Sequence, residues 1–219
     1  ICSGLVGSEM CIRDSIFHIP NFADETPVQK LPRDSFETPV DRPLLIAAGR
    51  LHVNKGFDTL LQALVSIPDA TLWLAGSGPE ERSLKNLAEE LAVTDRVRFL
   101  GWRNDVTALM TSGDMFVCPS RHEGLGSIVM ESWAHRCPIV ATNSQGPGEA
   151  IENGVTGLLT PVDEVTPLAQ AINKVLDDSD LRAQLIENGS DEYTARYSER
   201  VIVGQYNALY HELLEKPRP

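Results

Sequence analysis

Residues 115–131 read MFVCPSRHEGLGSIVME, and this stretch has three parts. Four apolar residues, 115–118, precede a polar loop with two glycines, and the apolar run 128–130 follows it. An apolar run that leads through a glycine-containing loop into a second apolar run is typical of a buried strand that turns into a helix. In open parallel sheets, ligands bind in loops of this kind, outside the carboxyl ends of the strands. The stretch therefore predicts an α/β fold with a binding site after this strand.

Further β-rich runs alternate with segments of helical period along the chain. We expect strands at residues 44–48, 71–75, 97–100, 115–118, 139–141 and 157–159. Between the first two of these runs, Leu60, Leu61 and Leu64 line one face of an expected helix. Strands that alternate with helices form βαβ crossovers, which give a parallel sheet covered on both faces. We therefore predict a Rossmann-like parallel sheet of six strands flanked by helices.

The last third of the chain predicts three helices. One begins at Thr166, whose hydroxyl can cap it, and Pro167 suits its first turn. Two more are expected near residues 181–188 and 198–214. Residues 178–180, Asp-Ser-Asp, superficially match a metal-binding acid pair, but they stand between two helices, where Ser179 would cap the second one.

Composition argues against several classes of protein. A formal net charge of -12 argues against general nucleic-acid binding, which needs a face rich in lysine and arginine. The apolar runs are far shorter than the roughly 20 residues that span a bilayer. The four cysteines form no Cys-x-x-Cys pair, and the histidines show no metal-ligand spacing. We expect no cofactor, no metal and a reducing, cytoplasmic setting.

The first 43 residues differ from the rest. Residues 1–15 have no helical or strand period and lack the basic start and apolar middle of a signal peptide. They resemble the translation of a sequencing adapter, and we expect a non-native or disordered tail. Residues 16–43 contain five prolines, which disfavour helix and strand pairing, so this segment predicts a linker between domains. The folded domain then spans residues 44–214.

Two cations follow the first expected strand. Arg50 and Lys55 stand five residues apart between Gly49 and Gly56, just before a helix. A guanidinium fork suits the paired oxygens of a diphosphate, an ammonium adds a compact charge, and a helix amino terminus adds partial positive charge. The pattern indicates an anion site; the alternative is a solvated loop with two surface cations.

Two glutamates accompany the glycines of the fourth loop. Glu123 stands within the loop and Glu131 about one turn into the helix. Carboxylates accept hydrogen bonds from the vicinal hydroxyls of ribose or hexose, while Gly124 and Gly126 let the backbone approach a ligand. Glu131 lies in an apolar segment, where a carboxylate needs a partner. For Glu123 the alternative is a solvent-exposed or capping acid.

Two other glycine-containing loops are less specific. Residues 76–78, Gly-Ser-Gly, suggest a dinucleotide fingerprint, but Glu81 stands where the third glycine should be, so a turn that feeds a helix is the stronger interpretation. Gly146 and Glu149 follow the fifth expected strand, where they would contact a bound sugar or cap a short helix.

Taken together, residues 49–56, 76–78, 95–101, 119–131 and 146–149 resemble the family-4 retaining glycosyltransferases in order and spacing. The resemblance runs from about residue 16 to 214 and implies the carboxyl-terminal, donor-binding half of a GT-B fold. It implies that Arg50, Lys55 and Glu123 are the catalytic groups at the diphosphate and the sugar. It also implies a set of donor-binding residues, with the nucleotide base near 98–103: Gly124, Leu125, Gly126, Glu131, Arg98, Gly146 and Glu149.

The resemblance further implies a nucleoside-diphosphate sugar as donor and a sugar or lipid-linked glycan as acceptor. The acceptor would be bound by an amino-terminal half that we expect to be missing, and membrane docking through that half stays open. Ser127 stands where the family usually has an apolar residue, and residues 134–138 lack a common glycine, so the subfamily also stays open. The alternatives are a non-catalytic nucleotide-binding module, an NAD-dependent oxidoreductase domain and a nucleotide-sugar epimerase.

Overall fold

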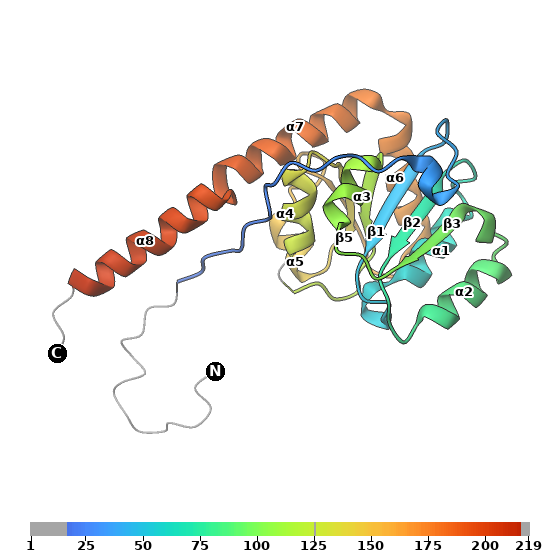
Figure 1. Cartoon of the computed structure of the whole chain (residues 1–219), viewed down its shortest axis with the longest axis horizontal. Coiled ribbons are helices and arrows are strands. Elements are labelled where there is room, and N and C mark those ends of the chain that lie inside the picture. Colours follow the sequence, from blue (N-terminus) through green and yellow to red (C-terminus); the bar gives the residue numbers. More distant parts are fainter. Residues whose placement is uncertain (1–16, 125, 216–219) are drawn as a thin grey trace, which may run out of the picture.

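The computed structural model describes residues 17–124 and 126–215, which surround a central sheet (Figure 1). The strands are β1 (Leu44–Ala48), β2 (Thr71–Ala75), β3 (Val97–Gly101), β4 (Met115–Cys118), β5 (Ile139–Thr142) and β6 (Leu158–Thr160). The helices are α1 (Phe57–Leu64), α2 (Glu81–Glu90), α3 (Val106–Ser112), α4 (Ser127–Ala134), α5 (Gln145–Ala150), α6 (Val165–Asp177), α7 (Ser179–Arg196) and α8 (Glu199–Glu215). Short 3-10 turns are η2 (Arg33–Phe36), η3 (Val53–Lys55) and η4 (Thr94–Arg96). The predicted tail, residues 1–15, lies outside the described residues.

The sheet has the topology that the sequence predicts. Its strands pair in the order β3-β2-β1-β4-β5-β6, and every neighbouring pair is parallel. The strand order reverses between β1 and β4, and open α/β sheets bind ligands in the crevice outside the carboxyl ends at such a point. The Rossmann-like fold is therefore confirmed, and the loops that follow β1 and β4 lie side by side.

Alternate residues along the strands fill two separate cores, because successive side chains point to opposite faces of a sheet. On one face, Leu45 and Leu72 belong to a core that includes residues of α1, α2 and α6. On the other face, Ile46 and Trp73 belong to a core that includes residues of α3, α4 and the end of α7. This double layer holds the strand ends, and hence the loops of the site, in fixed positions.

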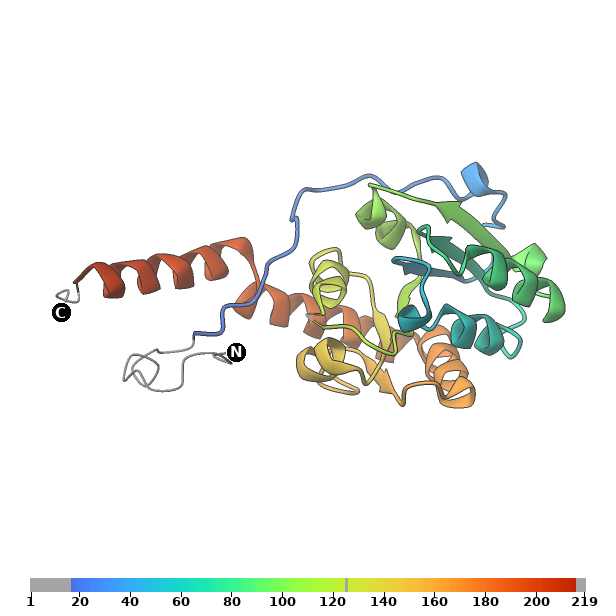
Figure 2. The ribbon, with the colours of Figure 1, turned by 90° about the horizontal axis from the view of Figure 1, so that it is seen from below.

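The segment before β1 packs along the face that α3 and α4 cover, in both views of the molecule (Figures 1 and 2). The indole N–H of Trp73 donates to the Thr38 hydroxyl (2.7 Å), and the Phe36 ring meets the same indole edge-on, with centroids 4.8 Å apart. Further along, the backbone N–H of Ala23 donates to the Tyr193 hydroxyl (3.2 Å). Residues 23–38 are thus anchored to the domain although most of them lie outside helices and strands.

Two helix starts differ from the predictions. α6 begins at Val165 without a side-chain cap, so Thr166 is not its capping residue. At the start of α7, the side chain of Asp178 accepts the backbone N–H of Leu181 (2.9 Å), which is the role predicted for Ser179. A carboxylate at this position caps as well as a hydroxyl does. Among residues 17–124 and 126–215, no cluster of acidic, histidine or cysteine side chains is suited to hold a metal ion.

α7 packs on the domain against α4 and α6, and α8 then extends away from the domain (Figure 2). α7 is much longer than predicted, and its end is held by the buried Tyr193. α8 buries Ile202 and exposes other apolar side chains, including Tyr206 and Tyr210. In the described part of the chain, no helix combines the length and the hydropathy needed to cross a membrane.

Candidate functional site

The loop after β1 presents its two cations at the carboxyl edge of the sheet. Arg50 is exposed, and no described residue forms a hydrogen bond or ion pair with it. Lys55 ends the turn η3 and precedes Gly56, which adopts a left-handed conformation (φ 62°) and starts α1. A Cβ on Gly56 would lie 2.1 Å from the carbonyl oxygen of Pro119, so glycine is required for this loop to pack against the loop after β4.

Lys55 and Glu123 meet across the two loops. The Lys55 Nζ atom lies 2.5 Å from Glu123 Oε2, and the Ser120 hydroxyl donates to the same oxygen at 3.4 Å. Both charged side chains are largely shielded, with exposed fractions of 26% and 16%. The expectation that these two residues share one site therefore agrees with their positions, and the partial burial strengthens their attraction relative to a surface pair.

Glu131 lies on α4 beside a cavity of about 190 Å³ that Arg50, Trp102 and Ile128 also line. Burial raises the pKa of the Glu131 carboxyl, and the negative charge of Glu123 raises it further. No described residue donates a hydrogen bond to this carboxylate. A half-buried carboxylate without a donor is well suited to accept hydrogen bonds from the hydroxyls of a ligand.

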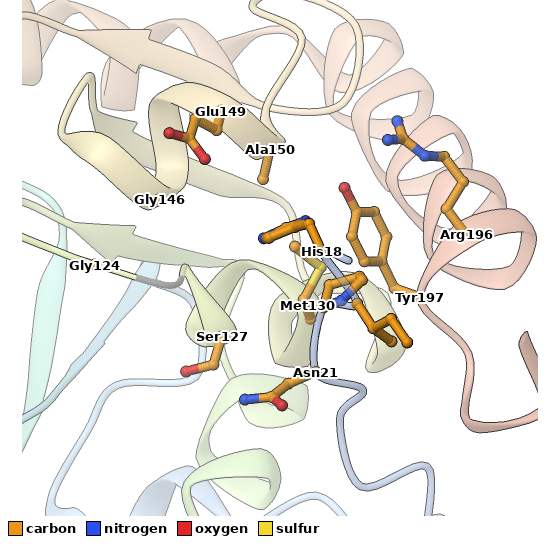
Figure 3. A pocket seen from close by; sticks show the side chains of 12 residues that line it. His18, Asn21, Gly124, Ser127, Met130, Gly146, Glu149, Ala150, Arg196 and Tyr197 are labelled. Carbon is orange, nitrogen blue, oxygen red and sulfur yellow. The ribbon is translucent and has the colours of Figure 1, made fainter. Parts of the chain in front are cut away.

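A second cavity, of about 400 Å³, opens beside the glycine-containing loop, and Gly124, Ser127, Gly146 and Glu149 line it (Figure 3). The backbone N–H of Gly146 donates to the carbonyl oxygen of Glu123 (2.7 Å), so the turn after β5 is fixed to the turn after β4. Leu125, a predicted donor-binding residue, lies outside the described residues. Of the other predicted residues of these two turns, Gly124, Gly146 and Glu149 border this one cavity.

Gly126 explains the close approach of the two turns. It adopts a left-handed conformation (φ 64°) directly before α4, and a Cβ there would lie 3.0 Å from the carbonyl carbon of Gly146. Gly124 has nothing within 4 Å of the corresponding position. Gly126 is therefore a packing requirement, whereas Gly124 leaves open space next to the cavity.

Arg98 was predicted to bind the donor, and this prediction is wrong. Its guanidinium donates to the carbonyl oxygens of Phe36 (2.8 Å), Glu37 (2.7 Å) and Asp95 (2.8 Å). Arg98 is the second residue of β3, so it lies at the amino end of the strand, away from the ligand side of the sheet. Its role is to fasten the segment before β1 to the domain.

The glycines of residues 76–78 serve packing between loops. A Cβ on Gly76 would lie 1.8 Å from the carbonyl oxygen of Gly49, and one on Gly78 would lie 2.3 Å from that of Leu51. The backbone N–H of Leu51 donates to Ser77 O at 3.0 Å. The loop that carries Arg50 thus occupies the space where a dinucleotide phosphate would approach a fingerprint turn, which favours the predicted turn.

Two residues of the site region were missed. Trp102 follows β3 with 79% of its surface exposed and lines the same cavity as Glu131. Arg121 stands two residues before Glu123 and forms ion pairs with Asp58 and Asp163. The position of Trp102 directly after a strand was a usable signal, whereas the partners of Arg121 are too distant in sequence to be inferred.

Several glycosyltransferases are similar to this chain in sequence. The family model of glycosyl transferases group 1 matches residues 29–192. The lipopolysaccharide core biosynthesis glycosyltransferase LpsE of Rhizobium meliloti (strain 1021) is 37% identical over 199 residues, which cover 91% of this chain and 58% of that protein. The alpha-D-kanosaminyltransferase of Streptomyces kanamyceticus is 30% identical, over 79% of this chain and 46% of that protein. The chain therefore spans about half the length of these relatives.

Solved structures show the same architecture. Anabaena HepE in complex with UDP and glucose has a TM-score of 0.81 and 26% identity, over 90% of this chain and 56% of that chain. The C-terminal domain of the glycosyl transferase group 1 family protein LpcC from Francisella tularensis has a TM-score of 0.68 at 21% identity, over 83% of this chain and 97% of that domain. The second likeness shows the fold alone. With the match of the family model, the chain belongs to the family of glycosyl transferases group 1.

Proposed function

We propose that the chain is the donor-binding half of a retaining GT-B glycosyltransferase, which moves a sugar from a nucleoside-diphosphate sugar to an acceptor held by another half. One observation carries the proposal. The shielded ion pair of Lys55 and Glu123 stands at the carboxyl edge of the sheet, next to the cavity that Arg50 and Glu131 share. Two cations for a diphosphate and two carboxylates for hydroxyls are the groups that such a donor needs.

The two cations would act on the leaving diphosphate. Negative charge grows on it as the bond to the sugar breaks, so Arg50 and Lys55 stabilise the transition state more than the bound donor. The Lys55 ammonium already touches Glu123, and a bound diphosphate would compete for it. Glu123 would then accept a hydrogen bond from a hydroxyl of the sugar, and the backbone N–H groups of Gly124 and Gly126 would face the phosphate.

The two cavities would bind the remaining parts of the donor, the nucleoside in one and the sugar in the other. Ribose hydroxyls would bind Glu131 in the cavity of about 190 Å³, where the exposed Trp102 offers a flat surface for the base. The sugar would occupy the cavity of about 400 Å³, near Ser127 and Glu149. The donor sugar and the acceptor stay unassigned, and the acceptor would be a sugar or a lipid-linked glycan.

Calorimetry with UDP, GDP and ADP tests the proposal on this chain. We expect at least one of them to bind, and Arg50→Ala to weaken that binding about tenfold or more, roughly 1.4 kcal/mol. Arg200→Ala is the matched control, because Arg200 is exposed on α8, outside the site. Unchanged affinity in Arg50→Ala would reject the proposed role of Arg50 at the diphosphate. Saturable NADH binding without any preference for nucleoside diphosphates would favour an oxidoreductase domain instead.

In this proposal, sugar transfer requires both halves of the enzyme. The isolated chain should bind donor and transfer almost no sugar, because the proposal assigns the acceptor to another half. Retention would be read from the anomeric proton of the product by NMR with full-length protein, and an inverted product would contradict it.

Free, buried Cys118 and Cys137 fit the cytoplasmic setting that we propose for this domain.

A further inference from the structure

Arg121 connects three loops at the ligand side of the sheet. Its Nη1 atom donates to the carbonyl oxygen of Val53 (2.6 Å) and to Asp58 Oδ1 (2.8 Å), and its Nη2 atom donates to Asp58 Oδ2 (2.7 Å). Its Nε atom lies 2.6 Å from Asp163 Oδ1, in the loop after β6. A bidentate guanidinium with a third partner fixes orientation as well as distance, which an ammonium could not do.

The backbone around Arg121 reinforces the same connection. The N–H groups of Arg121 and His122 both donate to the carbonyl oxygen of Asn54, at 2.8 and 3.2 Å. Asn54 directly precedes Lys55, and His122 directly precedes Glu123. The two residues that form the central ion pair are therefore each one position away from this junction.

Arg121 itself is in no position to add charge for a diphosphate. Two aspartates surround its guanidinium, and 24% of the side chain is exposed. The residue is absent from both hydrophobic cores of the sheet. Its removal should release the loops without dissolving the strands, because loop openings of this kind have far lower free energies than global unfolding.

We infer that Arg121 is a positioning residue, which holds Lys55 and Glu123 in the arrangement that receives the donor. The inference rests on the proposed function, since the donor is what the pair would receive. It assigns Arg121 to the geometry of the site, and Asp58 and Asp163 to holding Arg121 in place.

The decisive comparison is between Arg121→Gln and Arg33→Gln. Arg33 is a matched control, because its guanidinium also joins a loop carbonyl and an aspartate, Arg42 O (2.9 Å) and Asp114 (3.1 Å), but at the amino edge of the sheet. Both variants should lower the melting temperature by similar amounts. Only Arg121→Gln should weaken UDP binding, about tenfold, whereas Arg33→Gln should stay within about twofold of the parent.

A double-mutant cycle with Lys55→Ala shows whether Arg121 acts through the pair. If it does, Arg121→Gln should change UDP affinity much less in the Lys55→Ala background than in the parent. Fully additive losses, or equal affinity losses in Arg121→Gln and Arg33→Gln, would overturn the inference.

A measurement without nucleotide separates this inference from the proposed function. The side-chain NMR signal of Lys55, assigned with Lys55→Arg, should move toward the values of exposed lysines in Arg121→Gln and remain in place in Arg33→Gln. A signal that does not move refutes the positioning role even if UDP binds. A signal that moves as expected in a protein that binds no nucleotide supports the positioning of the pair and refutes the donor site.

Discussion

Replacing Glu131 with glutamine should weaken nucleotide binding and stabilise the free protein at the same time. Burial and the nearby charge of Glu123 raise the pKa of the Glu131 carboxyl, and no described residue donates a hydrogen bond to it. A carboxylate in this environment is less stable in the folded protein than in the unfolded chain. Glu131→Gln removes the charge and keeps the shape of the side chain.

The sizes of the two effects follow from these surroundings. A hydrogen bond to a charged group contributes about 1.5–3 kcal/mol, and glutamine retains one weaker acceptor oxygen, so we expect a loss near the lower end. That loss corresponds to roughly tenfold weaker UDP binding by calorimetry. Relief of a destabilising functional group should raise the free energy of unfolding by about 0.5–2 kcal/mol, measured by urea denaturation at neutral pH.

The pH dependence provides a check on the cause. Because the carboxyl pKa is raised in the folded state, the folded protein binds this proton more tightly than the unfolded chain does. The penalty is therefore full above the folded pKa and disappears as the pH falls to the ordinary value of 4.5, so the stability advantage of Glu131→Gln should vanish over the same range. Glu90→Gln, exposed at the end of α2, should change neither property. Unchanged UDP affinity, or lower stability at neutral pH, would refute the reasoning.

Two further predictions concern Trp102 and the glycines. Trp73 and Trp133 are 0% and 2% exposed against 79% for Trp102, so acrylamide quenching of the tryptophan fluorescence should come from Trp102. Saturating UDP should reduce this quenching in the parent protein, because the base would cover the indole. A quenching slope that UDP leaves unchanged would show that the base does not contact Trp102. Gly56→Ala should lower the free energy of unfolding, measured in urea, by about 2 kcal/mol or more, because Gly56 has a positive φ and a Cβ there would clash with the Pro119 carbonyl oxygen. Gly124→Ala should leave the free energy of unfolding almost unchanged. Equal stabilities of the two variants would show that the loops can shift to accommodate the added methyl group.

The strands were predictable because each one is a short run of mostly apolar residues. The bounds of β1, β2 and β4 agree with the prediction, and β6 is shifted by one residue. α7 was less predictable, because its buried stripe is Leu185, Gly189 and Tyr193. A glycine in such a stripe hides the helical period, although it is what permits the contact with Trp133, 2.4 Å from where a Cβ would lie.

The site was predictable where the topology alone determines it. Parallel strands bring their carboxyl ends to one edge, so Lys55 and Glu123 could be placed together without coordinates. Arg98 shows the limit of that rule, because its place within β3 puts it at the other edge. Arg121 shows another limit, since an arginine two residues before Glu123 in the loop after β4 looks like a ligand residue until its aspartate partners are known.

In the proposed site, the distribution of counter-charges would determine which anion binds. Aspartates neutralise two nearby arginines, Arg121 through Asp58 and Asp163, and Arg103 through Asp105. Arg50 has no such partner in the described part of the chain, and Lys55 has only Glu123. A single phosphate at Arg50 would gain little from an ammonium already held by a carboxylate. In the proposed site, a diphosphate that reached both cations would carry enough charge to compete with Glu123, so we expect the ion pair to favour two phosphates over one.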